Sequence, residues 1–465
     1  MSDQLIWDPL MIQRYNRSGP RYTSYPTAIE FAPAASDAME RDVLSRRTSK
    51  PLSLYLHIPF CRHVCYYCGC NKIVTKDKDQ AEEYLELLYR EIEMKAALVD
   101  TSRVVEQMHL GGGTPTFLSD DQLAELVNYL RQHFTFSSAE SADYSIEIDP
   151  RELGSDTLSR LRELGFNRVS FGVQDLDPDV QAAVNRVQSE EMIRDVMNQA
   201  RGLGFRSINI DLIYGLPHQT RETFARTLET ITDIRPDRLS VFNYAHLPQR
   251  FMPQRRINTA DLPEPAEKLA IFGLAIQHMN EAGYHYVGMD HFALPEDELS
   301  VAQRSGQLHR NFQGYTTHGN CDLIGLGVSS ISQMGPIFTQ NFTDLSNWSE
   351  AIRSNDLPTA KECLADKDDD IRKTMIMGLL CHLTVRFDDI DQRFMINSRR
   401  YFADELAELS GMENDGLIRI THEAITVTDA GRLMVRQACM AFDAYRNGSK
   451  NGSEDKEQPR FSKAI

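Results

Sequence analysis

From about residue 51, the chain alternates apolar runs rich in β-branched and aromatic residues with longer runs that have amphipathic helical spacing. The first pattern is typical of buried strands, and the second of helices with one buried face. Their alternation predicts βα units and a parallel sheet. The expected strands are "LSLYLHIP", "VVEQMHLGG", "DYSIEIDP", "RVSFGVQ", "SINIDLIYG" and "RLSVFNYA".

The helices between these strands begin with capping signals. Ser119 stands before one amphipathic run with Gln122 three residues later, and Thr220 stands before another that ends ahead of Pro236. Six βα units are too few for a closed eight-stranded barrel. The sequence therefore predicts an α/β fold with a partial (β/α)6 barrel, whose lateral opening can admit a large substrate.

The pattern changes on both sides of this barrel and predicts five segments. Residues 1–50 form an N-terminal extension, and residues 51–255 form the barrel. Residues 256–365, rich in Gly, His and polar residues, are expected to be loops and strands flanking the barrel. Residues 366–447 have the helix, β-hairpin, helix outline of a mainly helical, winged-helix-like domain, and residues 448–465 are a polar tail.

Charge and composition narrow the classes of function. The chain has 50 Lys and Arg against 67 Asp and Glu, a formal charge of -17, so no nucleic-acid partner is expected and an anionic ligand requires a local basic pocket. No charged start precedes an apolar core, and no apolar stretch approaches the ~18 residues of a membrane helix. We expect a cytoplasmic protein with no membrane partner.

Four of the eight cysteines stand in the stretch "HIPFCRHVCYYCGCN". A zinc site needs four closed ligands, so Cys61, Cys65 and Cys68 would need His57 or His63 to complete it. A thioredoxin-like redox motif would need only two of the thiols. The third interpretation is an iron-sulfur cluster held by three thiolates, which leaves one iron open to a small molecule.

Several polar or glycine residues stand where strands end, which is where barrel sites are built. "GGGTP" begins at Gly111, and its bare backbone suits close approach to a ligand, although a tight turn alone would also explain it. Glu147, Gln174 and Asp211 end the next three strands, where each carboxylate or amide either contacts a ligand or only orders a loop. Asp149 is expected on the face opposite to Glu147.

The spacing CxxxCxxC directly after the first strand, with Tyr67 before the third cysteine, resembles the radical S-adenosylmethionine (SAM) superfamily. Within it, "CYYCGCN" with Cys70, together with "GPRYTSYPTA", "NRVSFGVQDLDPDVQAAVNR", "NIDLIYGLPHQT", "DRLSVFNYAHLP" and "HRNFQGYTT", resembles the oxygen-independent coproporphyrinogen III oxidase family. The resemblance covers essentially the whole chain.

This resemblance implies oxidative decarboxylation of two propionates of coproporphyrinogen III to vinyl groups, giving protoporphyrinogen IX. It implies one [4Fe-4S] cluster on Cys61, Cys65 and Cys68, two SAM molecules, and hydrogen abstraction by a 5′-deoxyadenosyl radical. Cys70 is expected near the site without being a ligand. Carried over by motif, the SAM on the cluster would contact Tyr55, Gly112, Glu147 and Ile331. The second SAM would contact Tyr67, Gly113, Thr114, Gln174, Arg186, Asp211 and Ala245.

Substrate contacts follow from charge, because the substrate carries four carboxylates that suit bidentate arginines. The candidates are Arg21 and Arg310, with His309 and Arg250 behind them. Tyr22 and Tyr25 could pack on the macrocycle. The resemblance also implies a monomer, a low-potential electron donor such as a flavodoxin-type protein, and an electron acceptor that the sequence does not identify. The alternatives are a haem chaperone of the same branch, a radical SAM enzyme with another substrate, and a zinc-stabilised interaction protein.

Overall fold

The computed structural model describes residues 5–446, and these divide into two compact units. The barrel unit comprises Phe31–Glu264 and Asn320–Leu364. The second unit joins three separate stretches of the chain, residues 5–30, 265–319 and 365–446. The five consecutive segments drawn from the sequence stay a prediction, because the units are assembled from discontinuous stretches.

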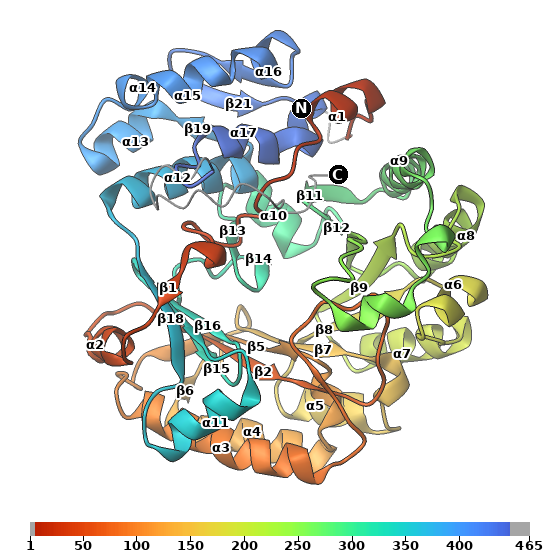
Figure 1. The fold of residues 1–465 in the computed structure, drawn as a ribbon, viewed down its shortest axis with the longest axis vertical. Coiled ribbons are helices and arrows are strands. Elements are labelled where there is room, and N and C mark those ends of the chain that lie inside the picture. Colours follow the sequence, from red (N-terminus) through yellow and green to blue (C-terminus); the bar gives the residue numbers. More distant parts are fainter. Residues whose placement is uncertain (1–4, 447–465) are drawn as a thin grey trace. The chain divides into compact units, whose positions relative to one another are not determined.

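The predicted partial barrel is confirmed in the barrel unit (Figure 1). Each of the six expected apolar runs forms a strand, and neighbours along the chain pair in parallel. They are β2 (Leu52–Ile58), β5 (Val104–Gly112), β7 (Asp143–Ile148), β8 (Arg168–Gln174), β9 (Ser207–Tyr214) and β10 (Arg238–Asn243).

Helices cross between these strands, as parallel connections require. They are α3 (Asp79–Ala96), α4 (Asp120–His133), α5 (Thr157–Glu163), α6 (Pro178–Ala183), α7 (Glu190–Gly202) and α8 (Arg221–Ile234). The predicted caps are present. Ser119 and Gln122 form a capping box on α4, and the Thr220 hydroxyl accepts from Thr223 N at the start of α8.

The sheet continues beyond the six predicted strands on the β2 side. β15 (Asp322–Leu326) pairs in parallel with β2, and antiparallel strands follow it outward. These outer strands are β16 (Ile331–Met334), β17 (Ile337–Asn341), β18 (Thr359–Leu364) and β1 (Ala32–Pro33). Three short further strands, β6 (Thr135–Phe136) and the β3–β4 pair described below, complete the described strands of this unit.

A fully buried ion network ties two helices to the end of β15. Lys95 Nζ on α3 lies 2.9 Å from a Glu40 oxygen on α2 (Ala38–Ser45), 3.1 Å from a Glu91 oxygen, and donates to Gly325 O at 2.7 Å. Glu91 also accepts from Gly327 N at 2.8 Å. Buried charges are stable only when paired in this way. The network thereby fixes the turn between β15 and β16.

The second unit is mainly helical, as predicted for the C-terminal part. Its helices are α1 (Pro9–Tyr15), α9 (Pro265–Glu281), α10 (Glu298–Arg304), α12 (Lys367–His382), α13 (Phe387–Phe394), α14 (Ser398–Tyr401), α15 (Ala403–Glu408), α16 (Ser410–Asn414) and α17 (Val435–Ala441). The hairpin of β20 (Ile418–Ile420) and β21 (Ala424–Val427), joined by β19 (Thr384–Arg386), supplies the winged-helix-like sheet.

Two smaller strand pairs belong to the same unit, β11 (His285–Gly288) with β12 (His291–Ala293), and β13 (His309–Asn311) with β14 (Gly314–Thr316). Nowhere in residues 5–446 is there a helix with both the length and the apolar composition to cross a membrane. The predicted polar tail, residues 448–465, lies outside the described residues.

Candidate active site

The cysteine stretch forms a loop that is closed at its base by two short strands. β3 (Phe60–Cys61) pairs in parallel with β4 (Ile73–Val74), and Thr75 N donates to Cys61 O at 3.0 Å. Cys61 and Cys65 are buried, Cys68 is half-buried, and Cys70 is exposed. Burial of the cysteines therefore decreases along the loop, from Cys61 and Cys65 to Cys70.

Each of the three predicted ligand sulfurs has a polar hydrogen donor beside it. Thr114 Oγ1 donates to Cys61 Sγ at 3.5 Å, Arg186 Nη1 donates to Cys65 Sγ at 3.4 Å, and Cys70 N donates to Cys68 Sγ at 3.4 Å. Such donors stabilise thiolates and tune iron-sulfur clusters. Three thiolates with donors at their sulfurs fit a cluster that leaves one iron open.

The thiol pKa values differ along the loop. Burial raises the pKa of Cys61 to about 11, while the Cys70 side chain, through a hydrogen bond, lowers the pKa of Cys68 to about 5. The adjacent Cys70 thiol has the opposite shift, because the same hydrogen bond raises its pKa. Cys70 thus touches the ligand set, in keeping with the expectation that it lies near the site.

The prediction for Asp149 was wrong, because residues two apart along an extended chain point to the same face. Asp149 is buried and holds two arginines at the cysteine loop. Its Oδ2 lies 3.0 Å from Arg186 Nη1 and 2.6 Å from Arg151 Nη2. Arg151 Nη2 in turn lies 3.7 Å from Cys65 Sγ. Two guanidinium groups therefore flank one predicted ligand sulfur.

The glycine run after β5 makes the backbone approach that its composition predicted. Gly112 has φ of +114°, and a Cβ there would stand 2.7 Å from the His57 ring. A Cβ on Gly113 would stand 2.7 Å from Phe60 O. Glycine is required at both positions, because any side chain would collide with the strand that leads into the cysteine loop.

Three of the four residues predicted for the SAM on the cluster lie together. Glu147 Oε2 accepts from Gly112 N at 3.3 Å, and its Oε1 lies 3.4 Å from His109 Nε2. The Tyr55 ring stacks on His109 with ring centres 5.9 Å apart, and its hydroxyl lies 3.2 Å from His57 Nδ1. Burial opposes ionisation of Glu147, but His109 and the Gly112 N–H lower its pKa below the usual value. The carboxylate is therefore poised as an acceptor.

Ile331, the fourth residue predicted for this SAM, is linked to Tyr55 by contacts of its backbone. A Cβ on Gly325 would meet the Ile331 backbone at 2.7 Å, and Gly325 is the register partner of Tyr55. β15, which sequence patterning did not include in the barrel, therefore brings Ile331 to the Tyr55 side of the site.

The residues predicted for the second SAM surround the ends of β8 and β9. Arg186 Nε donates to Gly172 O at 3.0 Å, and a Cβ on Gly172 would stand 2.8 Å from both Arg186 and Gln174. Gln174 has φ of +72° where the β8–β9 register shifts. Asp211 accepts from Asn209 Nδ2 at 2.8 Å, and burial with the nearby Glu147 charge raises its pKa to about 6.

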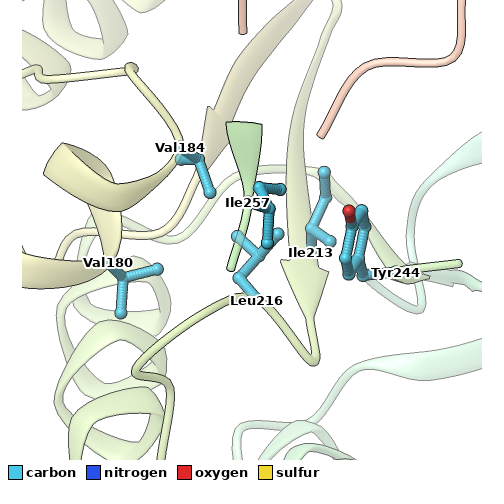
Figure 2. Packing of buried hydrophobic residues seen from close by; sticks show 6 residues of the cluster. All are labelled: Val180, Val184, Ile213, Leu216, Tyr244 and Ile257. Carbon is cyan, nitrogen blue, oxygen red and sulfur yellow. The ribbon is translucent and has the colours of Figure 1, made fainter. Parts of the chain in front are cut away.

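Tyr67 and Ala245 are joined by a residue that the sequence did not indicate. Gln254 Nε2 donates to Tyr67 O at 2.9 Å and to Ala245 O at 3.2 Å. Tyr66 and Tyr67 pack against an apolar cluster of Val180, Val184, Ile213, Leu216, Tyr244 and Ile257, which is shown in Figure 2. Tyr66 N also donates to Val184 O at 3.0 Å. This cluster anchors the cysteine loop to the barrel.

Comparisons with known proteins agree with this geometry. Residues 55–231 match the radical SAM superfamily, and residues 365–434 match the HemN C-terminal domain. The oxygen-independent coproporphyrinogen III oxidase of Pseudomonas aeruginosa is 52% identical over 96% of this chain and 97% of its own length. That of Escherichia coli is 48% identical over 95% and 96%. The chain belongs to the oxygen-independent coproporphyrinogen III oxidase family.

The structural comparison gives the same result. The E. coli coproporphyrinogen III oxidase, described as a radical SAM enzyme, superposes with a TM-score of 0.91 at 47% identity, covering 95% of this chain and all of that one. Members of the radical SAM superfamily use a [4Fe-4S] cluster and SAM, so these are the cofactors of this family member.

Of the residues predicted to bind substrate, Arg21, Tyr22, His309 and Arg310 lie in the second unit. Arg21 forms an ion pair with Asp290, and Arg310 Nε donates to Arg21 O at 3.3 Å. Arg310 also lies 4.7 Å over the Tyr315 ring. The structure therefore places the two arginines next to each other. His309 lies beside His382, with ring centres 6.5 Å apart.

Tyr22 is placed less favourably for packing on a ligand. It is fully buried, and its hydroxyl donates to Asp443 at 2.9 Å. Burial, followed by the Asp443 charge, raises the pKa of Tyr22 well above its usual value. In this structure Tyr22 orders the unit from within.

His109, Arg151 and Gln254 are the site residues that sequence reasoning missed. His109 precedes "GGG" by two positions on β5, so strand alternation could have placed its side chain on the same face of the strand as Gly111. Arg151 follows the "DP" that ends the β7 strand run. Gln254 stands in a loop, and no sequence signal marks it.

Proposed function

We propose that this chain is an oxidoreductase of haem biosynthesis that converts coproporphyrinogen III to protoporphyrinogen IX without oxygen, by oxidative decarboxylation of two propionate groups to vinyl groups. The observation that carries this proposal is the cysteine loop, whose three ligand sulfurs each have a donor within 3.5 Å and stand beside the glycine and Glu147 site. The named activity of the relatives, which match this chain over nearly its whole length, supports the substrate.

Cys61, Cys65 and Cys68 would hold the cluster, and Cys70 would stand beside it. When bound, the cluster and SAM supply a 5′-deoxyadenosyl radical that removes a hydrogen atom from the substrate. The chain's own residues orient the cofactor. Glu147, fixed by Gly112 N and His109, offers a carboxylate to a ribose hydroxyl or an ammonium group. The Tyr55 ring stacks on His109, and the Ile331 backbone lies against Gly325, the register partner of Tyr55.

A second SAM molecule is part of the proposal and would occupy the ends of β8 and β9. Arg186 offers a guanidinium for a carboxylate, because Asp149 and Gly172 O hold it in place. Asp211 and Gln174 offer polar groups from neighbouring strand ends. The remaining contacts in this proposal are Tyr67, Gly113, Thr114 and Ala245, which line the cysteine loop and the turns next to it.

Arg21 and Arg310 are proposed to bind substrate carboxylates, with His309 beside Arg310. The contact of the Arg310 guanidinium with the Arg21 backbone supports this role, because it brings two arginine residues together and guanidinium groups suit carboxylate ligands. Replacing Arg21 or Arg310 by Ala should raise the KM for coproporphyrinogen about tenfold or more, as expected for loss of a charge-assisted hydrogen bond. SAM cleavage without substrate should stay unchanged. Unchanged KM values in both variants would contradict the assignment.

The reaction also needs partners. A low-potential donor, such as a flavodoxin-type protein, supplies the reducing electron, and an acceptor takes the electron left on the substrate once CO2 departs. We further propose that the protein works as a monomer in the cytoplasm.

The test is an anaerobic assay of the iron- and sulfide-reconstituted protein with dithionite, SAM and coproporphyrinogen III, followed by chromatography. Protoporphyrinogen formed together with methionine and 5′-deoxyadenosine would support the proposal. A Cys65→Ser variant should lose product, whereas Cys363→Ser, a half-buried cysteine on β18, should keep it. SAM cleavage with coproporphyrinogen untouched would favour the haem chaperone, and haem binding would then be measured. Bound zinc without iron would favour the interaction protein.

A further inference from the structure

The cysteine loop and a second segment that packs against it are basic, although the chain as a whole is acidic. Residues 61–78 contain four Lys or Arg against one Asp, and residues 247–256 contain three Arg and no acidic residue, although the whole chain carries -17. Both segments belong to the barrel unit. We name as the basic rim the exposed or half-exposed residues Arg62, Lys72, Lys76, Arg250, Arg255 and Arg256.

The first segment of the basic rim is built onto the loop itself. Lys72 Nζ donates to Cys68 O at 3.2 Å. Lys76 follows Thr75, whose N–H is bonded to Cys61 O. Arg62 directly follows Cys61, and its charge is shared with Glu152 at 3.5 Å. Arg62 and Lys72 therefore stand within four residues of a predicted cluster ligand, and Lys76 follows a residue that is hydrogen-bonded to Cys61.

The second segment packs against the other side of the loop. A Cβ on Gly69 would stand 3.0 Å from the Phe251 ring, and the Arg256 guanidinium lies 5.2 Å from the centre of the Tyr66 ring. Gln254 bonds Tyr67 O, and Ile257 is buried in the apolar cluster (Figure 2). The 3-10 turn Met252–Arg256 is thus fixed in place, so its arginines form a stable surface.

Exposed apolar side chains lie within the basic rim. Met252 is 65% exposed, Val74 is 44% exposed and Leu247 is 41% exposed. Apolar residues bordered by arginines are typical of protein interfaces, where Met and Arg are enriched. Small, charge-steered contacts are characteristic of electron-transfer complexes.

We infer that the basic rim is the docking surface for an acidic, low-potential electron-carrier protein. The inference rests on the cluster of the proposed function. One electron passes from the reduced carrier to the cluster held by the three cysteines, so the carrier is oxidised by one electron and the cluster reduced by one, with no bond formed or broken. Electron transfer requires close approach, and the basic rim belongs to or packs on the loop that carries the ligands, which is exposed at Arg62, Gly69 and Asn71.

The test compares two charge-reversal variants that change the net charge equally. Lys76→Glu with Arg255→Glu alters the rim, whereas Arg353→Glu with Lys361→Glu alters exposed residues of the barrel unit elsewhere. Proteins of equal iron and sulfide content are mixed with photoreduced flavodoxin, an acidic flavin carrier, and cluster reduction is followed by absorbance. The rim variant should be reduced about tenfold or more slowly at low ionic strength, with the difference vanishing at high ionic strength. The matched control should behave as the unaltered protein.

Dithionite separates docking from the other uses of this surface, since a small reductant needs no docking site. With dithionite, the rim variant should keep its rate of product formation and its KM for coproporphyrinogen. Equal reduction of both variants by flavodoxin would overturn the inference. A raised KM with dithionite and an unchanged flavodoxin rate would also overturn it, because the rim would then bind substrate carboxylates. If the unaltered protein were reduced in this rim-dependent way but made no protoporphyrinogen, the proposed function would fail and the docking surface would stand.

Discussion

At the scale of single residues, Arg151 illustrates how the surroundings of a ligand tune a metal site. Its guanidinium is held by Asp149 and lies 3.7 Å from Cys65 Sγ. A cation at a ligand sulfur favours the reduced cluster, because reduction adds negative charge. Arg151→Gln should therefore lower the midpoint potential by some tens of millivolts, where about 60 mV is tenfold in a one-electron equilibrium.

An EPR-monitored redox titration of the loaded protein measures that shift. Arg160→Gln is the matched control, since Arg160 is an exposed arginine of α5 whose ion-pair partner is Glu163. A potential that is the same in the Arg151 variant and in the control would show that the guanidinium does not act on the cluster.

Asp211 gives a prediction about pH. Burial, together with the Glu147 charge, raises its pKa from 3.8 to about 6, so the folded protein binds this proton more tightly than the unfolded chain does. Its contribution to stability is present below pH 4 and is lost as pH rises through about 6. Replacing Asp211 by Asn removes this dependence. The variant should gain up to about 3 kcal/mol relative to the unaltered protein between pH 4 and pH 8.

Urea unfolding of both proteins at a series of pH values measures this difference. A stability difference between them that stays constant with pH would mean that Asp211 has an ordinary pKa in the folded state.

At the scale of elements, the buried ions of α2 and α3 secure the turn after β15. Replacing Lys95 by Met would leave Glu40 and Glu91 buried without their cation. Breaking a buried pair by removing one partner costs about 3–5 kcal/mol. We expect a loss of that size in the free energy of unfolding, measured in urea. Lys361→Met, at an exposed position of β18, should cost less than about 0.5 kcal/mol. Equal costs would mean that the network is dispensable.

At the scale of the whole molecule, charge decides which partners are excluded. The second unit has a winged-helix-like sheet, a form that many DNA-binding proteins share, but the chain carries -17. Binding to DNA depends on neutralising phosphates with Lys and Arg. We therefore expect no binding of a fluorescent duplex at physiological salt, measured by anisotropy. Micromolar binding that weakens with added salt would contradict this.

The sequence predicted the features that depend on local periodicity. The six strands and the helix caps at Ser119 and Thr220 follow from backbone geometry over a few residues, and the spacing of Cys61, Cys65 and Cys68 can be read directly along the chain. The match to the radical SAM superfamily and the partial barrel bear this out. Glu147 and Asp211 were predicted as site residues for the same reason, since parallel strands present their carboxyl ends at one edge, and this assignment stays a prediction.

Only the tertiary structure decided which distant residues meet. The pairing of β15 with β2, the contact of Arg151 with Cys65, the placing of His109 beneath Glu147 and the link from Gln254 to Tyr67 join residues 38 to 270 positions apart. Such contacts depend on sheet register and on the reach of individual side chains. Neither can be inferred from the spacing of hydrophobic residues along the chain. By itself the sequence determined the chemistry of the ligands and the class of fold. Folding decided the surroundings of those ligands, because these surroundings consist of side chains brought together from separate elements.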